Sequence, residues 1–250
     1  TRFDMMPAAY TDALTRLQDT VEPFPVAQVH EIVEEELGAR IKDVFAFFDE
    51  EPLAAAMGAG LDIVEAQGSM VVDIGGGTTD IAVYTNGAIR HTAVIPVAGD
   101  LITKDLAQAL RTPHSAAEYI KIHYGVAIPD MDGLDEMVEV PSVGDRQPRQ
   151  ISRRVLASVI GPRVEEILEL TLNELRRSGF PEEVLTSGIV LTGGASMLTG
   201  IVELAEEVFA LPARIGVPQE MGGVSERIRN PRYSTAIGLL QAARGEEDGA

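Results

Sequence analysis

Glycines and hydroxyl side chains directly follow an apolar segment in the first half of the sequence. Asp73 stands at the end of that segment, and the next residues include Gly75, Gly76, Gly77, Thr78 and Thr79. Bare glycine backbone lets amide groups approach an anion closely, and the threonines add hydroxyl donors. Asp73 is placed to hold the water shell of a magnesium ion that bridges phosphates. We therefore predict a phosphate cradle, although a tight hairpin whose glycines need positive φ angles would give the same pattern.

A second glycine turn, Thr192-Gly193-Gly194-Ala195-Ser196, also follows an apolar run and precedes a helical pattern. A strand that ends in glycines and leads into a helix is a common geometry for binding a nucleotide. Alone, this turn indicates little. Two such turns about 120 residues apart favour one ligand held between two halves of a sheet-based lobe.

The surrounding sequence predicts the elements that must position these turns. Strand patterns cover residues 69–74, 80–84 and 89–97, and the Asn86-Gly87 dipeptide predicts a hairpin turn between the last two. Helical patterns cover residues 101–111, 116–124, 152–178, 197–209 and 231–243, with Asp100 and Ser115 as expected N-caps of the first two. Residues 129–148 are rich in Asp, Gly and Pro, which predicts a surface excursion. The whole is an α/β arrangement.

The composition argues against several classes of function. At 250 residues and 45% hydrophobic content, the chain can form one large or two small cores. Its formal net charge of -19 repels nucleic acid and anionic lipid head groups. Without cysteine it has no disulfide, thiol nucleophile or cysteine zinc site, and no apolar run approaches the length of a membrane span. We expect a cytoplasmic protein that binds no nucleic acid.

Three segments resemble the bacterial actin-family cell-division protein FtsA. One begins VVDIGGGTTDIAVYTNGAIRHTAVIPVAGD, and the others are EMVEVPSVGD and GIVLTGGASMLTGIVELAEEVF, so the likeness extends over about residues 69–243. The resemblance implies that Asp73 and residues 75–78 form a phosphate loop. It implies further nucleotide-binding roles for Gly99, Asp100, Glu118, Lys121, Gly193, Gly194 and Ser196. The i,i+3 spacing of Glu118 and Lys121 puts both on one helix face, which an ordinary surface ion pair would explain equally well.

Five arginines flank or lie on the long predicted helix: Arg153, Arg154, Arg163, Arg176 and Arg177. In FtsA the corresponding helical subdomain receives the acidic tail of the tubulin-like FtsZ, so the resemblance implies an FtsZ-like filament partner or self-association. Arginines that only balance a very acidic chain would give the same pattern. FtsA ends in a basic amphipathic membrane helix, whereas residues 246–250 are mostly acidic, so we expect no direct membrane anchor.

The front of the chain resembles other families. Residues 7–56 resemble the AarF/UbiB atypical kinases, and about residues 50–75 resemble the rod-shape actin MreB, in which a glutamate before a proline faces the γ-phosphate water. This second resemblance makes Glu51 a candidate catalytic residue. The chain thus resembles a hybrid, natural or engineered, that crosses over at the shared Glu-Glu-Pro-Leu-Ala-Ala-Ala stretch.

Together these resemblances imply the second lobe of an actin-like, ribonuclease-H-like α/β fold, with the first lobe largely missing. Residues 1–68 should hold helices and a remnant of the first lobe. Residues 69–245 should form a nucleotide-binding lobe with a helical subdomain inserted at about 100–185, and residues 246–250 an acidic tail. The implied function is an adenine-nucleotide-binding scaffold of bacterial cell division that takes ATP or ADP with Mg²⁺.

Hydrolysis by such a lobe should be weak or absent, because the missing lobe supplies about half of the phosphate donors. Two alternatives stay open. One is a nucleotide-free interaction module that keeps the lobe and its partner surface, and the other is an atypical kinase fragment.

Overall fold

The computed structural model of the chain describes residues 56, 58–61, 68–86, 88–131, 133–143, 147–180, 185–218 and 230–238. All of them belong to one compact unit, Glu51–Ala250. The helices predicted within residues 7–37 and the candidate residue Glu51 lie outside the described residues.

A five-stranded mixed sheet forms the centre of this unit, in the order β3-β2-β1-β6-β7. Its strands are β1 (Ser69–Ile74), β2 (Thr79–Thr85), β3 (Ala88–Ile95), β6 (Ile189–Thr192) and β7 (Ala213–Ile215). β1, β2 and β3 form the predicted antiparallel meander, whereas β6 runs parallel to β1 and β7 parallel to β6. β1 and β6 are almost wholly buried, which accounts for their uninterrupted apolar sequences.

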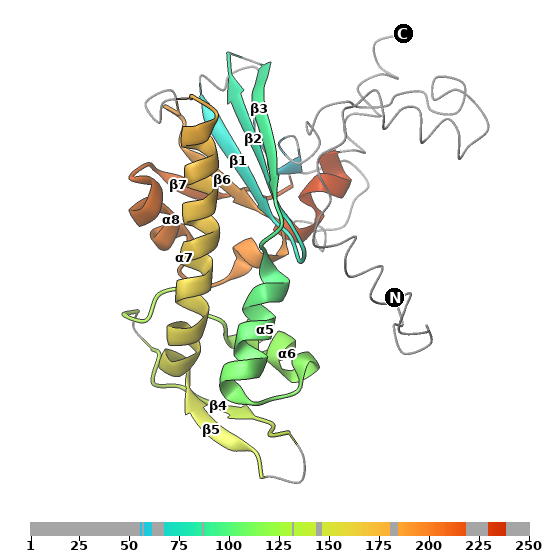
Figure 1. Ribbon diagram of the computed structural model, residues 1–250, viewed down its shortest axis with the longest axis vertical. Helices are drawn as coiled ribbons and strands as arrows, with labels where there is room; N and C mark the ends of the chain where they lie inside the picture. Colours follow the sequence, from blue (N-terminus) through green and yellow to red (C-terminus); the bar gives the residue numbers. More distant parts are fainter. Residues whose placement is uncertain are drawn as a thin grey trace, which may run out of the picture. The chain divides into compact units, whose positions relative to one another are not determined.

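The helices α5 (Gly99–Leu110), α6 (His114–Tyr124), α7 (Arg153–Arg177) and α8 (Ile201–Phe209) pack on the sheet or on one another. α7 crosses in front of the sheet with α8 beside it, and its lower half runs next to α5, on whose other side α6 lies (Figure 1). Leu156, Ile160 and Ile167 of α7 join Met70 and Val72 of β1 in one buried core. No helix in the described part of the chain is both long and apolar enough to span a bilayer.

A two-stranded hairpin extends the end of α7 that lies away from the sheet (Figure 1). It pairs β4 (Met137–Val140) with β5 (Arg149–Ser152). β4 shows the alternation of exposed and buried residues that its sequence predicts. The sequence gives no comparable signal for β5, because its polar side chains are exposed or half-buried, and β5 begins just after the excursion expected at residues 129–148.

Several predicted boundaries are wrong by one turn or less. Asp100 and Ser115 lie inside α5 and α6 rather than capping them, and neither helix has a side-chain cap. The single helix expected at residues 197–209 is split into the 3-10 turn η3 (Gly194–Met197) and α8, because Gly200 between them adopts φ 83°. The helix expected at residues 231–243 begins with the 3-10 turn η5 (Pro231–Tyr233).

Candidate functional site

The loop between β1 and β2 carries the glycine triplet and closes through one internal hydrogen bond. The amide of Gly75 donates to the carbonyl oxygen of Thr78 at 2.9 Å. The amides of Gly76, Gly77 and Thr78 donate to no residue that the structure describes, and all three residues are exposed. A Cβ atom added at Gly77 would meet no atom within 4 Å. The loop therefore offers three amides without a partner among the described residues and open space beside Gly77, as an anion-binding turn requires, while the Asp100 carboxylate lies close to Gly76.

None of the three loop glycines has φ in the left-handed region. A hairpin that needs positive φ therefore does not account for the triplet. Close approach to the loop accounts for it better, because Gly76 and Gly77 leave the amides uncovered.

The first residues of α5 hold the opposite side of this loop. The amide of Gly99 donates to Gly75 O at 3.0 Å, and the amide of Asp100 donates to Gly76 O at 2.8 Å. In a trans peptide the N–H points away from the C=O of the same plane. Holding the carbonyls of Gly75 and Gly76 against α5 therefore turns the amides of Gly76 and Gly77 away from α5. A Cβ atom at Gly99 would lie 2.9 Å from Gly75 O, so this contact requires glycine.

The two threonines of the loop have different surroundings. Thr78 is exposed, and its hydroxyl donates to Asp80 Oδ2 at 3.0 Å. Thr79 is fully buried, and its hydroxyl donates to the carbonyl oxygen of Val97 at 2.8 Å. The hydroxyl of Thr79 thus ties β2 to the segment before α5 and is not among the donors that face solvent. Only Thr78 has a hydroxyl at the open side.

Asp73 and Asp80 face each other across β1 and β2 at the base of the loop. Burial raises the pKa of Asp73, as does the charge of Asp80, while a hydrogen bond of 2.7 Å from the hydroxyl of Thr235 to Asp73 Oδ2 lowers it. Burial also raises the pKa of Asp80, against the hydrogen bond from Thr78. Like charges placed directly opposite each other on a sheet repel. A cation next to the loop would relieve this repulsion.

The second glycine turn, between β6 and η3, packs directly against the end of β1. Gly193 has φ 84°, and a Cβ atom there would lie 2.3 Å from Asp73 Oδ1 and 2.5 Å from Ile74 O. Ser196 is 1% exposed, and its hydroxyl donates to Gly193 O at 2.8 Å, so it stabilises the turn from inside. Gly194 is exposed. The pairing of β1 with β6 thus brings the two predicted turns to the same edge of the sheet.

Glu118 and Lys121 of α6 join the start of α5 through a shared cluster. Lys121 Nζ lies 3.0 Å from Gly99 O, 2.8 Å from Thr103 Oγ1 and 2.8 Å from Glu118 Oε2. The hydroxyl of Thr103 also donates to Glu118 Oε2. Burial opposes ionisation of Glu118, but the hydrogen bonds from Lys121 and Thr103 outweigh it and lower the pKa of Glu118. Lys121 is only 8% exposed, so the pair is not an ordinary surface ion pair.

This arrangement suits an anion next to a hydrated divalent cation. The donors at the open loop are backbone amides and one hydroxyl, which bind phosphate oxygens. No group of three or more potential metal ligands occurs among the described residues, so a cation would need ligand oxygens and water beside Asp73. Sequence reasoning missed Asp80, Thr103 and Thr235. Period-2 alternation could have identified Asp80 as the cross-strand partner of Asp73, but nothing local indicates the other two.

The five arginines flagged as partner-binding candidates do not form one free patch. Arg153 and Arg154 pair with Glu136 and Asp135, Arg163 pairs with Asp105 on α5, and Arg177 pairs with Glu174. Arg153 and Arg154 also donate to carbonyl oxygens of the segment before the hairpin. Four of the five thus have carboxylate partners within the chain, and their role in docking a partner stays a prediction.

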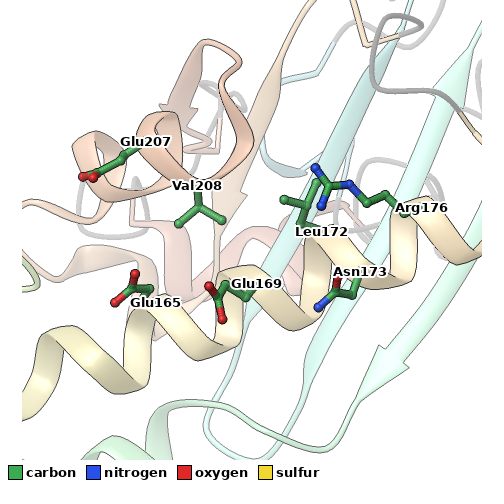
Figure 2. A pocket seen from close by; sticks show the side chains of 7 residues that line it. All are labelled: Glu165, Glu169, Leu172, Asn173, Arg176, Glu207 and Val208. Carbon is green, nitrogen blue, oxygen red and sulfur yellow. The ribbon is translucent and has the colours of Figure 1, made fainter.

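Arg176 borders a hollow of about 380 Å³ between α7 and α8 (Figure 2). Three carboxylates, from Glu165, Glu169 and Glu207, also line it, and Leu172 and Val208 contribute apolar surface. The residues that line this hollow include none from the glycine turns.

Comparison with known proteins gives the same assignment for most of the chain. The family model described as cell division protein FtsA matches residues 70–238, and the model of the ABC1 atypical kinase-like domain matches residues 16–59. A curated relative, cell division protein FtsA of Neisseria meningitidis serogroup B, is 64% identical over 193 residues. The match covers 77% of this chain and 47% of the relative. The chain thus spans about half the length of the curated relatives it matches.

Solved structures share the fold at low sequence identity. MreB5 of Spiroplasma citri bound to ADP superposes with a TM-score of 0.68 at 23% identity, over 89% of this chain and 66% of that one. The MamK double helical filament gives a TM-score of 0.59 at 18% identity, over 77% and 58%. The predicted actin-like α/β fold is therefore confirmed. Because the family model matches more than half of the residues, the chain belongs to the FtsA family of cell division proteins.

Proposed function

We propose that this chain is an adenine-nucleotide-binding scaffold of bacterial cell division, and that the two glycine turns hold the nucleotide. The observation that carries the proposal is the set of three bare amides at Gly76, Gly77 and Thr78, held open by α5. Amides arranged in this way bind phosphate oxygens. The ADP bound to the MreB5 neighbour, which shares the fold, is in line with this ligand class.

In this proposal a Mg²⁺ ion lies beside the phosphates. Asp73 holds water molecules of the ion, and the positive charge of the ion offsets the repulsion between Asp73 and Asp80. The two raised carboxyl pKa values support this placement, because a cation would stabilise both charged forms. The donors at the loop, three amides and one hydroxyl, suit the binding of phosphate oxygens, and the candidate catalytic residue Glu51 lies outside the described residues. We therefore propose binding with weak or no hydrolysis.

The scaffold role rests on membership of the family and includes assembly with a filament, either of this chain itself or of an FtsZ-like partner. The MamK neighbour, which shares the fold, is a double helical filament. Sedimentation of the full chain with and without Mg-ATP tests self-association. A pellet that forms only with nucleotide is the expected result.

Calorimetry with Mg-ATP on the full chain tests the nucleotide site. Gly77→Asp places a carboxylate in the open space of the loop, where it should repel phosphate and weaken binding by at least about tenfold. Gln147→Asp adds the same charge at an exposed position in the connection between β4 and β5 and should leave the affinity unchanged. If the folded wild-type chain gives no heat of binding, the nucleotide site fails and the interaction-module alternative takes its place.

A further inference from the structure

Two neighbouring hollows form one groove between α7 and α8. The first is the hollow of about 380 Å³ described above, and the second has a volume of about 450 Å³. Glu165 and Glu207 line both hollows, so the two adjoin, and residues 127–130 border the second. We call them together the α7–α8 groove. Its lining includes no residue of the glycine turns, so it is separate from the proposed nucleotide site.

The α7 wall of the groove is a straight stripe along one face of the helix. Its lining residues recur at intervals of three or four, namely Gly161, Glu165, Glu169, Asn173 and Arg176. At about 1.5 Å per residue this stripe is about 22 Å long, or about four helical turns. Of the described residues that line the groove, only Arg176, at one end, is cationic.

The groove has an apolar strip along most of its length. In the first hollow the strip consists of Leu172 and Val208, and in the second it includes Ile128, Pro129 and Leu204. A second helix could lay an apolar face on such a strip, as amphipathic helices do in the grooves of other proteins. The length of the stripe on α7 suits a helix of about fifteen residues.

The carboxylates of the groove lack a compensating cation. Glu165 and Glu169 of α7 and Glu207 of α8 are exposed and lie on the two walls of the first hollow (Figure 2). In the part of the chain that the structure describes, no ion pair joins any of the three to a cationic side chain, whereas the neighbouring Glu166 pairs with Arg163. Like charges at i,i+4 on a helix, such as Glu165 and Glu169, destabilise it. Cationic side chains from outside would remove this repulsion.

We propose that the α7–α8 groove docks a basic amphipathic helix of a partner protein. Aliphatic side chains of that helix would cover the apolar strip, while its lysines or arginines would pair with Glu165, Glu169 and Glu207. Charge complementarity favours this occupant over a second copy of the chain, because two chains of formal net charge -19 repel each other. The inference is independent of nucleotide binding.

The first test uses a labelled synthetic peptide of about fifteen residues that carries leucines on one helical face and lysines on the other. Fluorescence anisotropy measures its affinity for the full chain. We expect at least about tenfold weaker binding when the groove carboxylates are neutralised in Glu165→Gln/Glu169→Gln/Glu207→Gln. These exposed positions should tolerate the carboxamide, and circular dichroism checks that the variant is folded.

A matched variant separates the groove from the acidity of the whole chain. It neutralises three exposed carboxylates outside the groove, in Asp135→Asn/Glu139→Gln/Glu203→Gln. Both variants have the same formal net charge, so nonspecific attraction of the peptide is equal for the two. We expect the matched variant to stay within about twofold of the wild-type affinity. Equal weakening in the two variants would overturn the groove as the docking site.

A second peptide tests whether the groove recognises a helix face. The same residues in scrambled order keep the charge but lose the apolar face, so binding should weaken by at least about tenfold. Equal affinity of the two peptides would mean diffuse charge attraction and would overturn the proposal. Sedimentation of the chain without peptide covers the remaining occupant. If the groove variant alters self-association while the wild-type chain binds no peptide, a second copy occupies the groove and the proposal fails.

Discussion

The two glycine turns lie at the same edge of the sheet but use their glycines for opposite reasons. In the β1–β2 loop, the glycines have no left-handed φ, and Gly77 has no neighbouring atom within 4 Å. In the β6–η3 turn, Gly193 has φ 84° and approaches Asp73 and Ile74 so closely that no Cβ atom fits. Glycine leaves space for a ligand in the first turn, and it allows backbone packing in the second.

The polar groups of the two turns also differ: those of the second turn have partners within the chain, and several of those at the first do not. Around the second turn, the hydroxyl of Thr192 lies 2.7 Å from the hydroxyl of Ser234, and the amide of Gly193 donates to Pro231 O. At the first, two carboxylates face each other and three amides have no partner among the described residues. A satisfied turn contributes to stability, whereas an unsatisfied one is available for binding.

Gly193→Ala should destabilise the folded chain more than the other substitutions, because it combines backbone strain with overpacking. A left-handed φ costs a non-glycine residue about 1–2 kcal/mol, and overpacking a tight site costs about 1–3 kcal/mol more. We expect a loss of about 3 kcal/mol in the free energy of unfolding, measured with urea. A loss no larger than that of Gly77→Ala would contradict the distinction between the two turns.

Asp80→Asn should stabilise the chain modestly at neutral pH by removing the like charge opposite Asp73. Such cross-strand repulsion is worth about 0.5 kcal/mol, and asparagine can still accept the hydrogen bond from Thr78. Folding raises the pKa values of Asp73 and Asp80 above the ordinary 3.8. Between pH 3.8 and the raised values, the folded state therefore binds more protons than the unfolded state.

In wild type, the contribution of these protonated carboxyls to stability is fully present below pH 3.8 and is lost as pH rises through the raised values. The advantage of Asp80→Asn should therefore shrink as pH falls toward 4, which urea unfolding at several pH values measures. A constant advantage across pH would argue against charge repulsion as its cause.

Gly77→Ala should change stability least, by no more than about 0.5 kcal/mol in either direction, because the added methyl group enters open space at a permitted φ. Thermal unfolding of Gly77→Ala beside the wild type checks this. A clear loss of stability would show that the loop needs glycine for its own backbone, as the hairpin alternative holds.

The sequence predicts the site only as far as local patterns extend. The apolar runs of β1 and β6 and the glycines after them predict both turns and their shared edge, and the Asn86-Gly87 dipeptide predicts the β2–β3 turn, in which Asn86 adopts φ 51°. Residue types do not say which way a side chain points. Thr78 and Thr79 are identical in type, yet only the first faces solvent, because Thr78 lies in the loop whereas Thr79 is the first residue of β2.

Contacts between elements distant in the sequence could not be predicted. Lys121 meets Gly99 only because α6 folds back onto α5, and Thr235 meets Asp73 only because the segment after β7 returns to β1. β5 was missed because its partner strand β4, rather than its own sequence, determines its conformation. A helical pattern also does not decide which of two neighbouring apolar residues is buried: Val155 of α7 is 40% exposed, while Leu156 beside it is buried.

The pairing of β1 with β6 also affects how the chain folds. β1, β2 and β3 are neighbours in sequence, so their meander can form as soon as residue 95 is available. The parallel contact of Val71 with Val190 must wait until α5, α6, the β4–β5 hairpin and α7 have been synthesised. The first glycine turn therefore exists early in folding without its partner. Both glycine turns are together only after β6 has paired with β1. A newly made chain therefore becomes able to bind a ligand between them late in folding.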